Sequence, residues 1–532
     1  MSGFRKPEVP REQMVLWSQR LEDALPEDHP VRQVDWLLRS AAFAAAFKDW
    51  QREYMLVEGQ PPYHPRDLSG LYLYGMMNRI RSSRQLEAAC WNRLDVIWLM
   101  SGQHPDHSTI AQFVKDHSRR LRGMFKDVLR VGIQAGLVKL EHVAVDGTKV
   151  EADASKGSVH KRDTIAHELE QVEQQITALE AEWQANEARE ANLFGEQAPW
   201  SPPEQGSARQ RLARKQRQRQ RLEEALKMIE QRQQENPAGG TAKPIASTTA
   251  PDSRTMVDKE GRSKPNYNAQ AAVDTAEGMI VAGDVNDQPE DSGQLVPMVQ
   301  AVEGNCGSLP QEASADSQYN IGPDLAKMEE CGVTAFLPDS GQRETPAPDS
   351  PAGQALAAVR EGRTLTEEQW AALPLNNDKH ISHLAFTYDP AQDAYRCPMG
   401  QMLPFVRTSS KQAKWGQVYR LQYGGCPACA SCPRAAQCCK NPAQGRVVNR
   451  DQYEPCRERL RARMGSEHGR SRYRLRKQTV EPRFGQIKHA LGLRRFMRRG
   501  LDAVRTEWLM ACTAVNIGIL LRCWDRVAVV LG

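Results

Sequence analysis

Apolar residues recur at helical spacing through the first part of the chain. The stretches LPEDHPVRQVDWLLRSAAFAAAF, DLSGLYLYGMMNRIRSSRQLEAACWNRLDVIWLM and DHSTIAQFVKDHSRRLRGMFKDVLRVGIQAGLV all keep a period near 3.6 residues. We therefore predict an all-helical domain over residues 1–140. Short helices with Arg and Lys on exposed faces suit a helix-turn-helix reader of DNA, and they suit an ordinary helical bundle equally well.

The pattern then changes to short alternating segments, which predict strands. HVAVDGTKVEA (142–152) would hold Asp146 near its centre or end, and an aspartate in an apolar strand is unusual. NYNAQAAVDTAEGMIVAGDVN (266–286) predicts a hairpin, and a helix, SADSQYN, a second helix and the strand VTAFLP follow. This order predicts a mixed α/β core that is built from residues 141–159, 251–340 and 456–532.

Two segments interrupt this core, at residues 160–250 and 341–455. In the first, apolar residues step by four and three, as in a heptad seam: Ile165, Leu169, Val172, Ile176, Leu179 and Trp183. The helix that carries them is acidic, and the next one, SARQRLARKQRQRQRLEEALKMIEQRQQ, is strongly basic. We predict a hairpin in which the basic helix faces its acidic partner; a nucleic-acid-binding arm and a dimer contact are the alternatives.

Composition and charge narrow the class of protein. The chain has 532 residues and 40% hydrophobic content, so it has a real core and is not disordered. The net charge of +5 says little about partners, whereas local concentrations of positive charge say more. MSGFRKPEVP has no apolar signal core, and the longest apolar run, WLMACTAVNIGILL (508–521), is too short to span a bilayer. We expect a cytoplasmic, reducing location without membrane contact, in which clustered cysteines favour metal over disulfides.

Seven of the twelve cysteines lie between Cys397 and Cys456. Two overlapping Cys-x2-Cys units and a distant Cys-Pro fit a tetrahedral structural Zn²⁺ site, and the alternative is a set of free or redox-labile thiols. The predicted ligands are Cys397, Cys429, Cys432 and Cys438, with Cys426 and Cys439 as replacements. The other five cysteines, expected to be buried thiols, are Cys90, Cys306, Cys331, Cys512 and Cys523.

Three carboxylates follow the chain order of a ribonuclease-H-like metal site: Asp146, Asp316 and Glu481. Such a site needs carboxylates that converge on two Mg²⁺ ions, which activate the attacking oxygen and stabilise the leaving one. Each residue alone has an ordinary explanation, as part of a turn, an N-cap or a solvated helix face respectively. Other acids compete as ligands: Glu151, Asp153, Asp287, Glu290 and Asp291.

Glu481 lies in the most basic part of the chain. RYRLRKQTVEPRFGQIKHALGLRRFMRRG (472–500) holds ten Lys and Arg and a single acid. Lys488 follows Glu481 by seven residues, about two helical turns, so both would project from one face. The carboxylate would then hold metal, while the cations around it would contact DNA phosphates.

Many short motifs in one order resemble the DDE transposases of bacterial insertion sequences, specifically the large group with a helical N-terminal domain and a Cys-bearing insertion. They include LPEDHPVR, YHPRDLSGLYLYG, RSSRQLEAAC, PDHSTIAQF, HVAVDGTKVEADAS, NYNAQAAVD, ADSQYN and QTVEPRFGQIKHALGLRRFMRRG, and they run from about residue 25 to 521. The resemblance implies an α/β fold with a ribonuclease-H-like core and a DDE triad on Asp146, Asp316 and Glu481. It implies that Lys488 lies near the DNA end and that the N-terminal helices bind terminal inverted repeats.

The family's related Tyr-x2-Arg-x3-Glu-x6-Lys signature is matched with one departure. Tyr473 and Arg476 have the expected spacing, but four residues rather than three separate Arg476 from Glu481. The candidate DNA-contacting residues of this region are Tyr473, Arg476, Arg483, Lys488, Arg494 and Arg495.

The expected function is DNA transposition by a bacterial, nucleoid-associated enzyme. With two Mg²⁺ or Mn²⁺ ions, it would hydrolyse the phosphodiester at the inverted repeats of double-stranded DNA and transfer the freed ends into target DNA. Paired ends imply at least a homodimer on DNA. The alternatives are a catalytically inactive DNA-binding regulator derived from a transposase, and a nuclease of the same fold without strand transfer.

Overall fold

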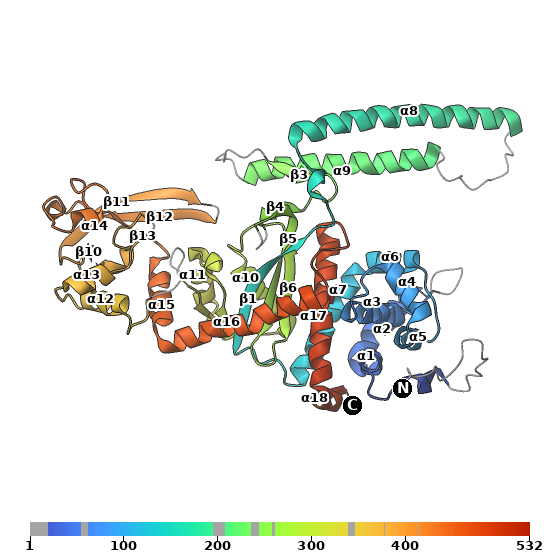
Figure 1. Ribbon diagram of the computed structural model, residues 1–532, viewed down its shortest axis with the longest axis horizontal. Coiled ribbons are helices and arrows are strands. Elements are labelled where there is room, and N and C mark those ends of the chain that lie inside the picture. Colours follow the sequence, from blue (N-terminus) through green and yellow to red (C-terminus); the bar gives the residue numbers. More distant parts are fainter. Residues whose placement is uncertain are drawn as a thin grey trace, which may run out of the picture.

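The computed structural model describes residues 20–54, 62–194, 208–235, 244–257, 261–338, 346–376, 378–413 and 415–531. Figure 1 shows a central sheet with the N-terminal helices on one side, a Cys-containing module on the other, and a long helical hairpin above. The start of the chain (1–19) and the loop between the hairpin helices (195–207) lie outside the described ranges.

The described N-terminal residues form helices, as their apolar spacing predicts. The elements are η1 (Leu21–Ala24), α1 (Pro30–Arg39), α2 (Ala41–Tyr54), α3 (Pro65–Met77), α4 (Ser83–Asn92), α5 (Leu94–Leu99), α6 (His107–Asp116) and α7 (Ser118–Gln134). Local chemistry sets where several of them begin. Ser82 and Gln85 form a reciprocal capping box at the start of α4, and the Asp106 side chain accepts N–H bonds at the start of α6.

The central sheet has the strand order β4-β5-β1-β7-β8, with β6 also paired to β5. Its strands are β1 (His142–Glu151), β4 (Arg254–Val257), β5 (Ser263–Asp274), β6 (Ile280–Asn286), β7 (Glu312–Ser314) and β8 (Thr334–Phe336). The pairs β1–β5 and β5–β6 are antiparallel, whereas β1–β7 and β7–β8 are parallel. The predicted mixed α/β class is therefore confirmed.

Helices from distant parts of the chain pack on this sheet, apart from α18, which packs on α7 and α17. They are α10 (Leu295–Cys306), α11 (Gly322–Glu330), α15 (Glu454–Gly465), α16 (Glu467–Gly485), the π-helical turn η7 (Gln486–Ala490), α17 (Leu501–Arg522) and α18 (Trp524–Leu531). By length and composition α17 is apolar enough to cross a membrane, but 78% of its apolar window is buried inside the protein. Trp508 donates to the Gln270 carbonyl, and Asn516 bonds both backbone groups of Ile280, so α17 is a core helix.

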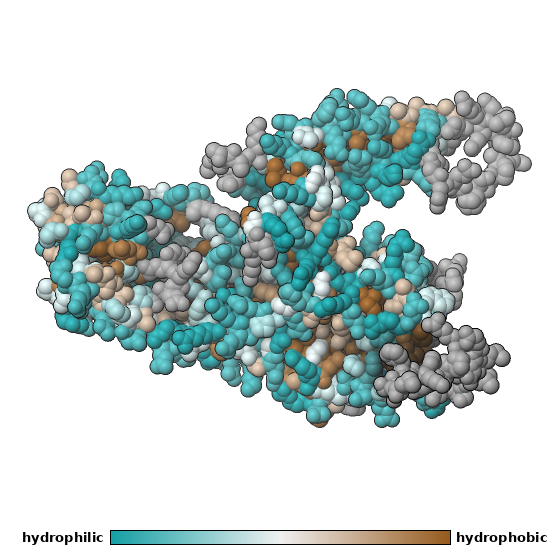
Figure 2. Space-filling view, in the orientation of Figure 1, coloured by the Kyte–Doolittle hydropathy of each residue, from teal (hydrophilic) through white to brown (hydrophobic). Residues whose placement is uncertain are grey.

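The first interruption forms the helical hairpin. It consists of η2 (Lys156–Ser158), β2 (Val159–Lys161), α8 (Arg162–Phe194), α9 (Ala208–Glu235) and β3 (Ile245–Ser247). The residues of the heptad seam meet Leu212, Leu222, Ala225 and Ile229 of α9 in a separate apolar cluster. The hairpin therefore has its own core, and its outer surface is hydrophilic (Figure 2).

The second interruption is a module with its own sheet and its own apolar cluster. Its elements are α12 (Pro351–Arg360), α13 (Glu367–Ala372), η5 (His383–Ala385), β9 (Thr387–Asp389), β10 (Ala394–Arg396), β11 (Met402–Ala413), β12 (Gly416–Tyr423), η6 (Pro427–Cys429), α14 (Ala435–Cys438) and β13 (Val448–Asp451). The strands follow the order β13-β12-β11-β10-β9.

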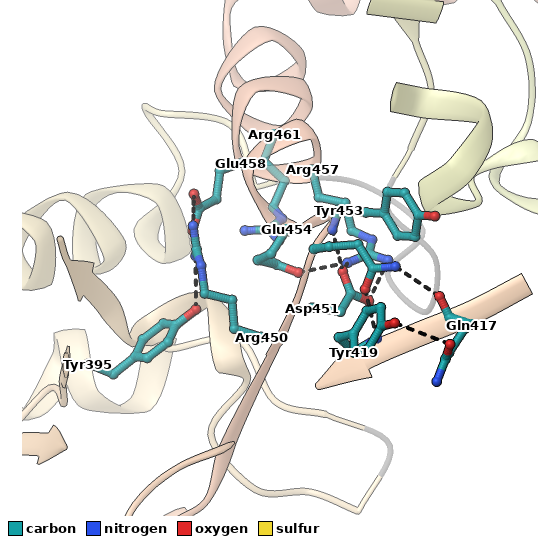
Figure 3. A network of polar contacts seen from close by, with 11 residues as sticks. Tyr395, Gln417, Tyr419, Arg450, Asp451, Tyr453, Glu454, Arg457, Glu458 and Arg461 are labelled. Atoms are coloured by element: carbon teal, nitrogen blue, oxygen red, sulfur yellow. Dashed lines mark hydrogen bonds and ion pairs between the residues drawn. The ribbon is translucent and has the colours of Figure 1, made fainter. Parts of the chain in front are cut away.

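A polar network joins this module to α15 (Figure 3). Arg450, on the last strand of the module, bonds the carboxylate of Glu458 on α15. Arg457 bonds Asp451 at 2.8 and 3.0 Å and Glu454 at 2.9 Å. Because α15 leads directly into α16, this network also fixes where α16 begins relative to the sheet.

Candidate functional site

Two of the predicted carboxylates lie side by side because of sheet register. The neighbouring strands β1 and β7 are parallel, with Ala144 opposite Ser314. Asp316 follows the end of β7, and this register, continued by two residues, brings it level with Asp146. The charge of Asp316 raises the pKa of Asp146, as expected if the two carboxylates are neighbours, and neighbouring strands lie about 4.8 Å apart. Residues at the same level of a parallel pair project from the same face. The register therefore brings together two acids that are far apart in the sequence.

The Asp146 side chain is only 15% exposed. One of its oxygens accepts the Gly147 N–H at 3.0 Å, and the other accepts from Arg476 Nη1 at 2.9 Å. Burial raises the pKa of Asp146 to about 6; the charge of Arg476 opposes the rise, and the negative charges of Asp316 and Asp291 add to it. Asp146 is therefore largely shielded from solvent, forms an ion pair with one cation, and lies near two further acids.

Asp316 follows β7 and caps the short helix η4 (Ser317–Tyr319), where it accepts the Gln318 N–H at 2.8 Å. Burial raises the pKa of Asp316 as well, and the charge of Asp291 contributes to the rise. Asp316 is therefore an N-cap, as one explanation of the sequence had it. Capping uses only one carboxylate oxygen of Asp316, and the carboxylate remains beside Asp146.

Glu481 lies on α16, which packs against β1 and β5. Its side chain is 51% exposed, and its Oε1 lies 4.0 Å from Arg476 Nη2. Arg476 itself is buried, contacts Asp146 through Nη1, and holds its guanidinium 5.8 Å from the Tyr473 ring. Arg476 therefore lies between the first and third predicted acids, and Tyr473 supports it.

Asp291 is a further acid near this site, and its charge raises the pKa of Asp146 and of Asp316. Its hydrogen-bond partners pair with Gly147 and Lys149 and so project from the other face of the sheet from Asp146. Its Oδ1 accepts from Asn268 at 2.7 Å and from Gln270 at 2.6 Å, and Tyr319 donates to Gln270 in turn. From the sequence, Asp291 was one of several competing acids, and Asn268, Gln270 and Tyr319 were not predicted to be part of the site. A signal was present, because Asn266, Asn268 and Gln270 alternate along an otherwise apolar strand, which places three polar side chains on one face.

The other predicted DNA contacts have varied surroundings. Lys488 lies in η7 rather than on a continuous α-helix, and its Nζ donates to the Lys149 carbonyl of β1 at 2.8 Å. Arg483 donates to carbonyls at the β5–β6 turn, at 2.7 Å for Gly278. The remaining two are exposed: Arg494 contacts His489, and Arg495 pairs with Asp153 at 2.8 Å.

The thiols of the Cys-containing module gather around one small cavity. Five of them line it: Cys397, Cys429, Cys432, Cys438 and Cys439. Burial raises the pKa of Cys438 to about 12. Burial also raises the pKa of Cys397, and backbone N–H bonds from Gln401 and Met399 oppose that rise. Such N–H···S bonds stabilise a thiolate. The donor chemistry therefore fits a thiolate-bound metal.

Neither group of residues is drawn together as tightly as a bound ion would require. Within the described part of the chain, no three His, Cys, Asp or Glu side chains are arranged closely enough to hold a metal ion. The carboxylates nevertheless offer the oxygen ligands that Mg²⁺ prefers, and the cysteines offer the thiolates that Zn²⁺ prefers.

Arg476→Gln should destabilise the metal-free protein by about 3 kcal/mol, because it leaves the charge of Asp146 without its buried partner. Thermal unfolding measures this loss, and millimolar Mn²⁺ should restore part of it by binding to the folded state. The matched control is Arg459→Gln, which removes an exposed ion pair with Glu329 and should cost about 0–1 kcal/mol. An equal loss in both variants, or no restoration by Mn²⁺, would contradict the assigned role of Arg476.

Two family models match the chain. Residues 19–116 match a family described as "Transposase domain (DUF772)", and residues 396–521 match "Transposase DDE domain". No curated protein and no solved structure matches it. Both matched families are described as transposase domains. Together with the order of the motifs, these two matches support the prediction of a DDE transposase of the insertion-sequence type. The second match spans Glu481 and the clustered cysteines.

Proposed function

We propose that this transposase cuts DNA at terminal inverted repeats and joins the freed ends to target DNA, using Asp146, Asp316 and Glu481 in a ribonuclease-H-like core. The observation that carries the proposal is the parallel pairing of β1 with β7, which brings Asp146 and Asp316 together, with Glu481 linked to Asp146 through Arg476. The strand order around this pair, three antiparallel strands followed by two parallel ones, supports the assignment of the core.

The protein residues divide the work between metal and DNA. Asp146, Asp316 and Glu481 would hold two Mg²⁺ or Mn²⁺ ions, which when bound supply a more acidic attacking hydroxyl and charge stabilisation of the leaving oxygen. Arg476 neutralises Asp146 in the metal-free protein. Arg494 and Arg495, which are exposed and follow η7, are placed to contact phosphates near the cut.

The clustered cysteines would serve a separate, structural purpose. We propose that Cys397, Cys429, Cys432 and Cys438 hold one Zn²⁺, with Cys426 or Cys439 as replacements. Two paired DNA ends would require at least two copies of the protein. The N-terminal helices would recognise the inverted repeats, and the protein would act on double-stranded DNA in the bacterial cytoplasm.

The test uses a supercoiled plasmid that carries the gene's own flanking inverted repeats, incubated with the wild-type protein in Mg²⁺ or in EDTA. A transposase produces 3′-OH ends at the repeat boundaries and joined products, and neither forms in EDTA. Cleavage without joining would support the nuclease alternative. Binding without cleavage in either Mg²⁺ or Mn²⁺ would support the inactive regulator.

A further inference from the structure

The basic helix α9 packs against its acidic partner α8, but most of its described cations form no ion pair with that helix. Between residues 209 and 221 it carries seven cations and no acid: Arg209, Arg211, Arg214, Lys215, Arg217, Arg219 and Arg221. Arg211 pairs with Glu182 of α8 at 2.6 Å, and Arg219 pairs with Glu223 of its own helix at 3.5 Å. Among the residues that the structure describes, no carboxylate pairs with the other five. The two helices associate through their apolar seam, so the charge remains available.

Four of these cations line one groove beside the loop that follows β3. Arg214, Lys215, Arg217 and Arg221 come from α9, and the loop contributes Thr248 and Thr249. The acid in the groove wall is Glu168, which accepts a hydrogen bond from Gln218 at 3.0 Å. Cations together with hydroxyl groups are the donors that bind phosphate oxygens along a DNA backbone.

A second groove continues the first toward the catalytic sheet. The two share Arg221 and Thr249. The second also contains two cations, Lys227 and Arg499, and two acids, Glu224 and Asp252. Arg499 pairs with Asp153, two residues beyond the end of β1, at 2.9 Å. Asp146 lies five residues before the end of that strand, which is about 17 Å at about 3.3 Å per residue. The segment of β1 that leads from Asp146 toward the second groove is therefore shorter than one turn of a DNA duplex, which is about 34 Å.

We propose that this α9 groove binds the phosphate backbone of the DNA duplex whose end lies at the carboxylates. That the bound duplex leads to the carboxylates rests on the proposed function, whereas the binding of DNA in the groove does not. The occupant is a polyanion because cations and hydroxyl groups dominate the lining, while the apolar seam is already buried between the helices. On the face seen in Figure 2, the hairpin is mostly hydrophilic, with small apolar patches between its polar side chains. Backbone contacts carry no base information, so the binding is independent of sequence.

The experiment compares two double variants of one helix with equal loss of charge. Arg217→Gln/Arg221→Gln removes two groove cations, and Arg209→Gln/Arg219→Gln removes two that do not line the groove. Fluorescence anisotropy follows binding to a mixed-sequence duplex without inverted repeats over a range of NaCl concentrations. The groove variant should lower the slope of log K against log[salt] by about 2 and weaken binding about tenfold or more, whereas the control stays near wild type.

Equal slopes for the two double variants would overturn the proposal. So would a groove variant that keeps its slope but changes from dimer to monomer in sedimentation velocity, because that result assigns the surface to a protein contact. If circular dichroism shows that the groove variant is misfolded, Arg214→Gln/Lys215→Gln replaces it. Plasmid cleavage by the wild type is measured separately and tests only the proposed function. If the wild type does not cut, the result on the salt slope still decides whether the groove binds DNA. If the wild type cuts and the groove variant keeps the wild-type slope, the proposed function stands and only the groove proposal is refuted.

Discussion

Glu481→Gln protein should bind inverted-repeat DNA like wild type but cut it about a thousandfold more slowly. The change keeps the size of the side chain and removes the charge that holds metal, and metal contributes several kcal/mol to such a reaction, at about 1.4 kcal/mol for each factor of ten. The side chain is 51% exposed, so folding should be unaffected. Single-turnover cleavage of a labelled repeat end measures the rate, and anisotropy measures the binding.

Two further variants identify the carboxylates that complete the site. Asp146→Asn should lose as much activity as Glu481→Gln, because the Asp146 side chain is only 15% exposed and lies beside Asp316. Asp291→Asn should stay within about tenfold of wild type, since two amides already hold its Oδ1. Asp284→Asn serves as a control, because Asp284 pairs with Arg505 on the surface at 2.9 Å. If Asp291→Asn lost cleavage while Glu481→Gln kept it, Asp291 would replace Glu481 as the third ligand.

The local sequence pattern predicts the strands and helices of this site better than it predicts how they pack together. Alternation and β-branched residues identified β1, and apolar residues around a turn identified the β5–β6 hairpin, although β5 is buried on both faces. That Asp146 and Asp316 stand level depends on the parallel pairing of β1 with β7, across 170 residues of chain. The intervening hairpin adds length without altering this register, so no local pattern reports it.

Gly147 shows how a residue with a plausible local explanation can have a different one. An Asp-Gly pair is typical of a turn, yet β1 continues through it to Glu151. A Cβ on Gly147 would lie 2.3 Å from Asp291 Oδ1 and 2.4 Å from Gln270 Nε2. The glycine therefore lets the Asp291 network approach the strand beside Asp146. Only the tertiary structure places those side chains there, so sequence reasoning could not supply this cause.

The helical hairpin shows the same limit for charge. Opposite net charges on two neighbouring helices suggest ion pairs between them, but charge lies on the outer faces when the apolar seam alone sets the packing. Glu170 and Glu173 of α8 are exposed, and so are Arg214 and Arg217 of α9. Sequence composition gives the number of these charges but not the face of the helix from which each side chain projects. That face decides whether the cations of a basic helix pair with a neighbouring helix or are available to DNA.

Removing zinc should have the largest effect on stability. The purified protein should contain about one Zn²⁺ per chain, and Cys429→Ser should remove it, because structural zinc contributes about 10 kcal/mol or more to the folding of small modules. Elemental analysis measures the metal, and limited proteolysis within residues 346–451 measures the integrity of the module. Its apolar cluster, which includes Leu356 and Tyr423, should keep part of the fold without the metal. The expected result is therefore a loosened module rather than an unfolded chain.

Single-cysteine variants then distinguish ligands from bystanders. Cys438 lies near Cys439, Cys397 and Cys429, whose charges raise its pKa further, and all of the candidate ligands except Cys426 line one cavity. Because Cys438 is one of the four predicted ligands, Cys438→Ser should lose zinc as Cys429→Ser does. The Cys439 Sγ instead donates to the Ala435 carbonyl at 3.5 Å, so Cys439→Ser should keep the metal. Cys331→Ser, outside the module, is the matched control. Zinc-free wild type, or zinc retained by Cys429→Ser, would refute the metal site and favour free thiols. Because the network at Arg450 and Arg457 couples the module to α15 and α16, zinc loss should also slow cleavage at the distant carboxylates without abolishing it.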